Sequence, residues 1–190
     1  TSFVAIEAIT LTAPAAAGDT LVVQGTNASD TIAAAFDTAN RVWVNDRAVV
    51  RFGNYETLSL LGRAGDDKFS VSPVGMLGLT GGINVDGGDP TASDELVVNG
   101  TINADTINFA PTAADAGSVT VNLSAPIAFT TIESVVISGQ GGNDLLTVTT
   151  PADTTQPRIT SVHVIETSDL RSRVRIRFSE PMERSGLGDA

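Results

Sequence analysis

Short runs in which apolar and polar residues alternate cover most of the chain, and turns rich in glycine and aspartate separate them. In the run TLVVQ at 20–24, Leu21 and Val23 occupy alternate positions and Gly25 follows. Alternation with a period of two is the pattern of a β-strand with one buried face. Aromatic residues make up only 5% of the sequence, whereas glycine, threonine, valine, alanine and aspartate recur throughout. Pattern and composition together predict an all-β protein of many short strands rather than a helical bundle.

One 14-residue pattern occurs four times. It reads acid, any residue, Leu or Val, any residue, Val, Leu or Ile, any residue, Gly, four residues, Asp, any residue, and Ile, Phe or Leu. The copies are DTLVVQGTNASDTI from Asp19, ETLSLLGRAGDDKF from Glu56, DELVVNGTINADTI from Asp94 and ESVVISGQGGNDLL from Glu133. Their starts are 37, 38 and 39 residues apart. Copies one and three share nine of 14 residues, so a doubled unit of about 75 residues is also compatible with the spacing.

Each repeat of about 38 residues contains three strand-like runs, two inside the pattern and one before the next copy. The third runs are RVWVN at 41–45, INV at 83–85 and VTV at 119–121. Strands that restart at the same point of every repeat predict a three-faced parallel β-solenoid of about four coils. Stacked coils would form two interior ladders: Leu21, Leu58, Leu96 and Val135, and then Val23, Leu60, Val98 and Ile137. Extra short strands are expected around Phe52 and Phe129. A β-sandwich of the same strands is the alternative fold.

The sequence changes character after residue 150. We expect residues 1–150 to form the repeat domain and residues 151–157, PADTTQP, to be a linker. Beyond it, RITSVHV and RSRVRIRFSEPM read as strands, and four alternate arginines of the second run share one face: Arg171, Arg173, Arg175 and Arg177. That face is either solvated or docks onto an anionic surface. Residues 158–190 are too few to form a sandwich alone, so we expect the truncated beginning of a second β domain.

The formal net charge is −11, and the acidic excess lies in the first part of the chain. Residues 1–150 contain five basic and 16 acidic side chains, whereas residues 151–190 contain six of each. Such a surface repels nucleic acid and anionic membranes and attracts cations. The chain has no cysteine and no run of about 18 apolar residues, which argues against disulfides, thiolate chemistry and membrane insertion.

The second acid of each copy is a candidate cation ligand. Coils stacked about 4.8 Å apart would align four aspartates along one edge, where like charges repel by about 1 kcal/mol in water. Either each aspartate caps main-chain amides of its own turn, or calcium bridges the row with six to eight oxygens. The candidate ligands are Asp30, Asp66, Asp67, Asp105, Asn143 and Asp144.

The turns of copies two and four resemble the haemolysin-type (RTX-like) calcium-binding repeat, GGxGxDxUx. Its pattern is matched at Gly62, Gly65, Asp67 and Phe69, and again at Gly139, Gly142, Asp144 and Leu146. In that family the nine-residue repeats run in tandem, whereas here each coil has one, and Ala28 and Asn103 replace the second glycine in copies one and three. The tail, PRITSV to VRIRFSEPM, is similar to the start of bacterial Ig-like domains of surface-layer and adhesive proteins.

These resemblances imply an extracellular or cell-surface module of a larger bacterial protein, with calcium as the expected cofactor. Its expected role is structural or adhesive, and its expected partners are a cell-surface polymer or other copies of itself, in a homo-oligomer or filament. Residues Val22, Val97 and Val136 fall on the outward side of their strands, where loops cover them or where copies associate.

Enzymatic activity is not expected. Residues 1–150 contain no histidine and one lysine, Lys68, and the sequence has no nucleophile elbow, phosphate loop or histidine metal spacing. The alternative is a carbohydrate-binding or polysaccharide-cleaving solenoid, for which Trp43 and Tyr55 are the candidate sugar-stacking residues.

Overall fold

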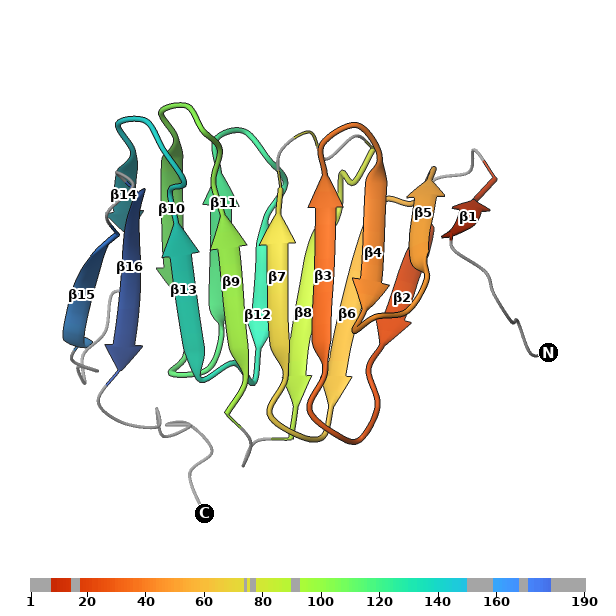
Figure 1. Ribbon diagram of the computed structural model, residues 1–190, viewed down its shortest axis with the longest axis horizontal. Helices are drawn as coiled ribbons and strands as arrows, with labels where there is room; N and C mark the ends of the chain where they lie inside the picture. Colours follow the sequence, from red (N-terminus) through yellow and green to blue (C-terminus); the bar gives the residue numbers. More distant parts are fainter. Residues whose placement is uncertain are drawn as a thin grey trace, which may run out of the picture.

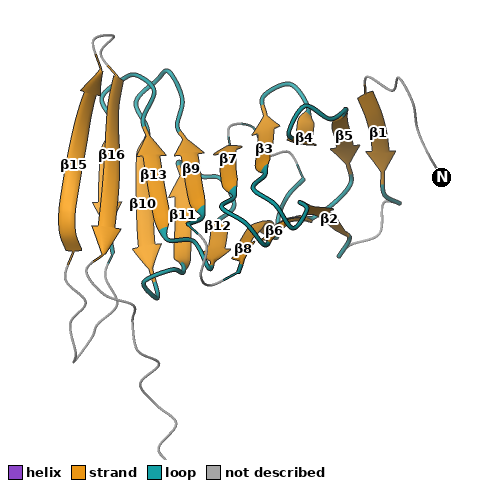
Figure 2. Ribbon diagram, turned by 60° about the horizontal axis from the view of Figure 1, so that its bottom comes forward, coloured by secondary structure: helices purple, strands orange, loops and turns teal. Residues whose placement is uncertain are grey.

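The computed structural model describes residues 8–14, 18–73, 75, 78–89, 93–149, 159–167 and 171–178, the last two ranges as main chain only. These residues form 16 strands and no helix, so the all-β class is confirmed (Figures 1 and 2). No described helix is therefore long and apolar enough to cross a membrane. The predicted linker at 151–157 lies outside the described residues, as do the side chains of the four arginines in the tail.

The strands form two mixed sheets that lie one over the other (Figure 2). Sheet A contains, in spatial order, β1 (Ala8–Thr12), β5 (Val49–Gly53), β4 (Asn40–Val44), β3 (Thr31–Phe36), β7 (Lys68–Ser72), β9 (Glu95–Asn99), β13 (Ser134–Ser138), β16 (Arg171–Phe178) and β15 (Ile159–Thr167). Sheet B contains β14 (Leu145–Val148), β10 (Thr106–Pro111), β11 (Gly117–Val121), β12 (Ile127–Thr130), β8 (Gly82–Gly88), β6 (Thr57–Arg63) and β2 (Thr20–Gln24).

Two sets of seven strands share one pattern of pairing, and we name them unit 1 (β1–β7) and unit 2 (β8–β14). The strand β1 pairs with β5 as β8 pairs with β12, and β2 pairs with β6 as β9 pairs with β13, all in parallel. The antiparallel order β3, β4, β5 recurs as β10, β11, β12. Finally, β3 pairs in parallel with β7 as β10 does with β14.

Corresponding strands of the two units belong to opposite sheets. Strands β1, β3, β4, β5 and β7 belong to sheet A, while their counterparts β8, β10, β11, β12 and β14 belong to sheet B. Strands β2 and β6 belong to sheet B, and their counterparts β9 and β13 to sheet A. A unit visits the sheets five times in alternation, and since five is odd, the next unit starts in the other sheet.

This exchange contradicts the predicted interior ladders. Leu21 and Leu58 are followed in sheet B by Ile83, whereas Leu96 and Val135 follow Phe69 in sheet A. The second ladder divides in the same way, into the pair Val23 and Leu60 and the pair Val98 and Ile137. Both predictions were wrong because β8 inserts one more pass between copies two and three.

The described strands occupy two sheets where three faces were predicted. The runs at 41–45 and 119–121 supply β4 and β11, which fold back antiparallel beside the preceding strand instead of forming a third face. The run at 83–85 lies in β8, which crosses to sheet B and pairs in parallel with β6. The extra strands expected at Phe52 and Phe129 are present as β5 and β12.

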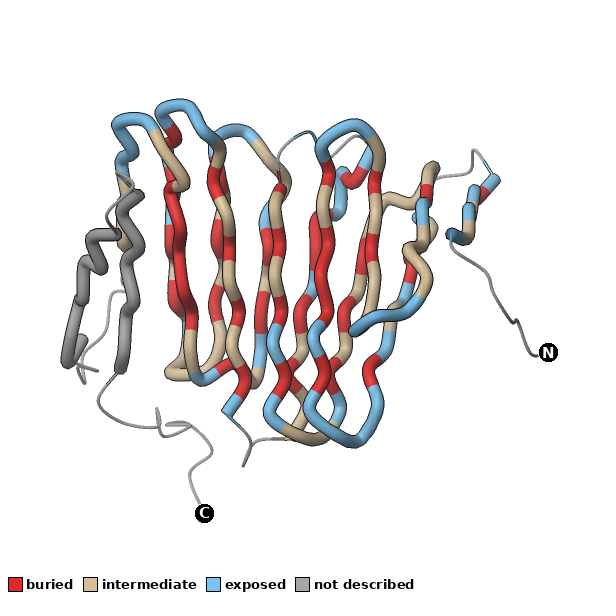
Figure 3. Tube along the Cα trace, viewed as in Figure 1, coloured by how far each residue is buried: buried red, intermediate tan, exposed pale blue. Residues whose placement is uncertain are grey.

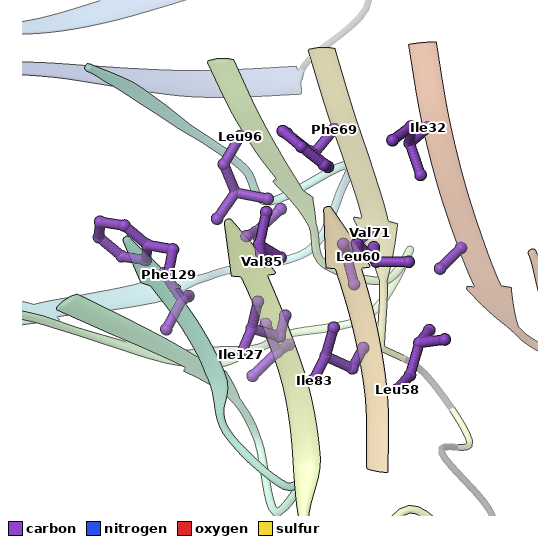
Figure 4. Close-up of a cluster of buried hydrophobic side chains, with 14 of the residues drawn as sticks. Ile32, Leu58, Leu60, Phe69, Val71, Ile83, Val85, Leu96, Ile127 and Phe129 are labelled. Carbon is purple, nitrogen blue, oxygen red and sulfur yellow. The ribbon is translucent and has the colours of Figure 1, made fainter. Parts of the chain in front are cut away.

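One hydrophobic core fills the space between the sheets and continues through both units (Figures 3 and 4). Strands in the middle of the stack alternate between buried and partly exposed residues, as β6 and β9 do. Side chains of sheet A such as Phe69 and Leu96 meet side chains of sheet B such as Leu60 and Ile83. All four have 0% exposure, so neither sheet buries its apolar face without the other.

The tail extends sheet A beyond unit 2. Strand β16 pairs antiparallel with β13, and β15 pairs antiparallel with β16. The stack therefore begins with β1 and β2 at one end and finishes with β13, β14 and the tail strands at the other (Figure 1).

Candidate functional site

The candidate site is the set of corners at which the chain passes from one sheet to the other. Five of these corners begin with a glycine and end with an aspartate whose carboxylate folds back over that glycine. A Cβ atom on Gly25 would lie 2.8 Å from Asp30 Oδ2, and one on Gly100 would lie 2.6 Å from Asp105 Oδ2. The close approach recurs in three more pairs: Gly62 and Asp67, Gly87 and Asp94, and Gly139 and Asp144. Glycine is required here because any side chain would displace the carboxylate.

The sequence pattern misses the corner between Gly87 and Asp94. Two additional residues separate its glycine from its aspartate, compared with Gly25 and Asp30. The pattern therefore assigns Asp94 only as the opening acid of copy three. The signal in the sequence was a glycine after an alternating run, followed by an aspartate before the next alternating run.

In copies one and three the second aspartate caps its own turn. Asp30 Oδ2 accepts hydrogen bonds from the Thr26 amide at 2.5 Å and the Thr26 hydroxyl at 2.9 Å. Asp105 accepts the equivalent pair from Thr101, at 2.6 and 3.1 Å. These hydrogen bonds are those of the capping role, which the sequence offered as the alternative to calcium binding.

Two asparagines that sequence reasoning missed complete these caps. Asn45 Nδ2 donates to Asp30 Oδ1 at 2.6 Å, and Asn45 Oδ1 accepts the Thr31 amide at 2.7 Å. Asn122 makes the same two contacts in unit 2, with Asp105 at 2.6 Å and the Thr106 amide at 2.9 Å. Both asparagines have positive φ, 52° and 56°, which Asn tolerates better than most residues. The sequence signal is Val-x-Val-Asn, which closes β4 and β11 alike.

The acids of successive corners are joined by hydrogen bonds from amide to carboxylate, forming what we call the carboxylate ladder. The Asp30 amide donates to Asp67 Oδ1 at 2.7 Å, and the Asp67 amide donates to Asp94 Oδ1 at 2.7 Å. The Asp94 amide then donates to Glu133 Oε2 at 2.8 Å. These four acids follow one edge of the stack, where the chain leaves sheet B for sheet A.

The predicted row of Asp30, Asp67, Asp105 and Asp144 is therefore wrong. Asp105 and Asp144 lie at the opposite edge, where the chain leaves sheet A for sheet B, and the Asp105 amide donates to Asp144 Oδ1 at 3.0 Å. The sheet exchange moves the corners of copies three and four to that edge. In their place Asp94 and Glu133 continue the row of Asp30 and Asp67.

The carboxylates of the ladder differ in electrostatic environment. Burial raises the pKa of Asp67 to about 6, and the negative charges of Asp94, Asp30 and Asp66 add to this rise. Burial likewise raises the pKa of Asp94 and the pKa of Glu133, again with help from neighbouring acids. Burial also acts on Asp30, but hydrogen bonds from Thr26 and Asn45 outweigh it, and its pKa is lowered. The Oδ2 atoms of Asp67 and Asp94 are buried without a hydrogen-bond partner among the described residues.

The predicted calcium ligands do not come together in one group. Asp66 Oδ1 accepts the Ser93 amide at 3.2 Å beside Asp67, whereas Asn143 and Asp144 belong to the opposite edge. In the part of the chain that the structure describes, no three acidic or histidine side chains are arranged to hold a metal ion. The Oδ1 atoms of the ladder face main-chain N–H groups, and this donor set does not fit calcium.

The two candidate sugar-stacking residues lie in different environments. Tyr55 packs edge-on against Phe52, with ring centroids 6.2 Å apart, and contacts the core. Trp43 is partly exposed on β4, opposite Ala33 of β3. They do not stack on each other, and Tyr55 is engaged with the protein interior.

No protein-family model, curated protein or solved structure matches this chain.

Proposed function

We propose that this chain is a non-enzymatic structural module, wound as a flattened parallel β-solenoid with two faces. Parallel pairing between successive passes supports this winding over a β-sandwich, because strands β2, β6 and β8 stack in parallel register and so do β3, β7, β9 and β13. The short antiparallel excursions β4, β5 and β11, β12 are additions to the coils.

The observation that supports the structural role is the set of hydrogen bonds that the corner acids accept. The acids at the corners accept main-chain amides of their own turn or of the neighbouring coil, so they hold coils together. A catalytic carboxylate pair would instead face a substrate cleft. With the resemblances noted above, the role that fits is a stiff spacer or adhesive part of an extracellular bacterial surface protein.

An assay against polysaccharides tests this proposal against the carbohydrate alternative. The chain is incubated with a panel of bacterial and plant polysaccharides while reducing ends and Trp43 fluorescence are measured. We expect neither signal to change, because the corner acids accept main-chain amides and Tyr55 packs against Phe52. Release of reducing ends would refute the structural role, and a saturable fluorescence change would identify a carbohydrate-binding module.

Calcium is expected from the resemblance alone, and it is not part of the proposed structural role. Protonation of the buried Asp67 Oδ2 atom requires no other ligand atoms, whereas calcium requires six to eight oxygen ligands. We therefore expect the thermal unfolding midpoint at pH 7.5 to be the same in EDTA and in millimolar calcium. A calcium-dependent rise of several degrees, abolished in Asp67→Asn, would instead show that the ladder binds the ion as RTX-like repeats do.

A further inference from the structure

The two units meet through a joint formed by two parallel strand pairs, β7 with β9 in sheet A and β6 with β8 in sheet B. In sheet A, Phe69 lies opposite Leu96 and Val71 opposite Val98, and all four have 0% exposure. An ion pair of 2.8 Å between Lys68 and Glu95 also crosses this joint. The ladder crosses it as well, through the amide of Asp67.

Each end of the stack carries one half of the same joint. Unit 2 finishes with β13 and β14, the counterparts of β6 and β7, and unit 1 starts with β1 and β2, the counterparts of β8 and β9. In sheet B, β14 and β2 are the outermost of the described strands, at opposite ends (Figure 1). The first unit thus presents the surface that β8 and β9 present inside the chain, and the second presents the surface of β6 and β7.

Apolar side chains at the two ends of the stack are more exposed than their counterparts in the internal joint. Val23 of β2 is partly exposed, whereas its counterpart Val98 is fully buried. Val148 of β14 is partly exposed, whereas its counterpart Val71 is fully buried. On the outward side, Val22 is 51% exposed. Apolar side chains are therefore left incompletely covered at the positions that the internal joint buries (Figure 3).

We propose that the β13–β14 end binds the β1–β2 end of a second copy of this chain, in the register of the internal joint. This inference rests on the proposed structural function and names its partner. In that register Leu146 lies opposite Leu21 of the second copy, Thr147 opposite Val22 and Val148 opposite Val23. Because the two surfaces differ, the contact is head to tail and leaves a free end on each copy for further growth.

The acids at the edge opposite the carboxylate ladder support the same register. Asp144 corresponds to Asp67, and Asp19 corresponds to Asp94, so the Asp144 amide meets the Asp19 carboxylate of the second copy. Asp19 already repeats the role of Asp94 toward its own coil, since its amide donates to Glu56 Oε2 at 2.8 Å. Its Oδ2 atom is buried and has no hydrogen-bond partner among the described residues.

One contact of the joint is absent from the docked ends. Gly88, with a φ of 108°, approaches the Arg63 main chain so closely that no Cβ fits. Pro14 occupies the corresponding position in unit 1, and a proline ring cannot adopt that φ. The pairing of β1 with β13 therefore stops before Pro14.

The tail strand β16 competes with this docking. It pairs antiparallel with β13 at the edge that corresponds to the β8-binding edge of β6. A second copy can pair with β14 in sheet B at once, but it reaches β13 only when β16 leaves. The tail is therefore an exchangeable cap that limits association, as proteins commonly cover an edge strand to prevent uncontrolled pairing.

Cysteine cross-linking tests the register, since the chain has no cysteine of its own. A Val22→Cys chain is mixed with a Thr147→Cys chain and oxidised, and we expect a cross-linked dimer. Opposed residues on adjacent strands lie about 4.8 Å apart, within the range of a disulfide. Thr120→Cys replaces Thr147→Cys as the matched control, because Thr120 lies on β11 inside sheet B. Ser70→Cys with Val97→Cys in one chain is the positive control, because these residues face each other across the internal joint.

The same mixture in an Arg175→Pro background tests the cap. Arg175 lies opposite Val136, and proline removes its main-chain N–H, so β16 is weakened and the cross-link yield should rise several-fold. A yield no higher than that of the Thr120→Cys control, in both backgrounds, would overturn the docking. Equal yields in the two backgrounds would overturn the role of the cap.

The internal Ser70 and Val97 cross-link shows whether the Arg175→Pro chain is folded. If it is not, the dependence of the Val22 and Thr147 cross-link on protein concentration in the unsubstituted background decides the docking. A negative result leaves the structural role intact, because that role is judged by the polysaccharide assay.

Discussion

Asp30 and Asp67 occupy equivalent corners, but their carboxylates have different partners. Asp30 accepts hydrogen bonds from Thr26 and Asn45, which stabilise its charge. Asp67 accepts the Asp30 amide, while its buried Oδ2 has no partner among the described residues. Residue type and position in the pattern are the same, so the difference in pKa comes from the neighbours alone.

We predict that Asp67 makes the protein less stable at neutral pH than at mildly acidic pH. Its pKa is about 6 when folded, against an ordinary value of 3.8, so the folded state binds more protons between these values. Its contribution to the free energy of unfolding therefore rises as the pH falls from about 6 toward 4, by up to about 3 kcal/mol. Chemical denaturation between pH 4 and 7.5 should show this slope, and Asp67→Asn should reduce it, leaving the part that Asp94 and Glu133 contribute.

Asp30→Asn is the contrasting variant. The pKa of Asp30 is lowered, so its stabilising contribution is present at neutral pH and is lost only as the pH falls below the ordinary value of 3.8. Asp30→Asn should therefore reduce stability at pH 7.5 while keeping the gain between pH 6 and 4. An unchanged slope in Asp67→Asn would mean that another group titrates there.

At the scale of elements, the corners decide how one strand follows the next. A glycine closes the first strand and lets the carboxylate of the corner acid fold back over it, so the chain reaches the other sheet with its acid in place. Strands β4 and β11, the first of each antiparallel excursion, are followed by Asn45 and Asn122, which tie these strands to the corner acids. Strand pairing and corner chemistry are thus coupled at the same residues.

We predict that Gly62→Ala costs about 3 kcal/mol of unfolding free energy, because its Cβ would strike the Asp67 carboxylate and the Gly87 carbonyl oxygen. Gly53→Ala is the matched control, since a Cβ on Gly53 would meet nothing within 4 Å. Urea denaturation of both variants measures the difference. Equal effects of the two substitutions would show that the close approach at the corner is not a constraint.

At the scale of the whole molecule, the two units share one core. Buried side chains form a single cluster from Leu21 to Ile137, and the joint contributes some of its most buried members. Neither unit can expose its joint surface without exposing apolar side chains to water. Cooperative unfolding of both units together is the consequence.

Trp43, the only tryptophan, reports on unit 1 and makes this testable. Phe109 lies in unit 2, is fully buried and stacks on Phe129, so Phe109→Ala should cost about 3–5 kcal/mol. We predict that this substitution lowers the unfolding midpoint of Trp43 fluorescence by as much as that of circular dichroism. A fluorescence midpoint that stays in place while circular dichroism shifts would show that the units unfold independently.

The all-β class, most of the short strands and four of the glycine–aspartate corners could be predicted from the amino-acid sequence. These features depend on local chemistry: alternation buries one face of a strand, and a glycine followed by an aspartate makes a turn. The spacing of the repeat also predicted that Asp30 and Asp67 are neighbours, and the hydrogen bond from the Asp30 amide to Asp67 confirms it.

Which corners share an edge of the stack depends on the three-dimensional packing of the chain. Alignment of Asp67 with Asp94 rather than Asp105 depends on how many times the chain has crossed between the sheets, and one additional strand, β8, reverses the outcome. The pKa of Asp67 depends on the same number of crossings, because the corner acids beside it belong to other coils. Local patterns repeat along the chain without recording such a count, so the edges, the ladder and the exchanged units follow from long-range packing.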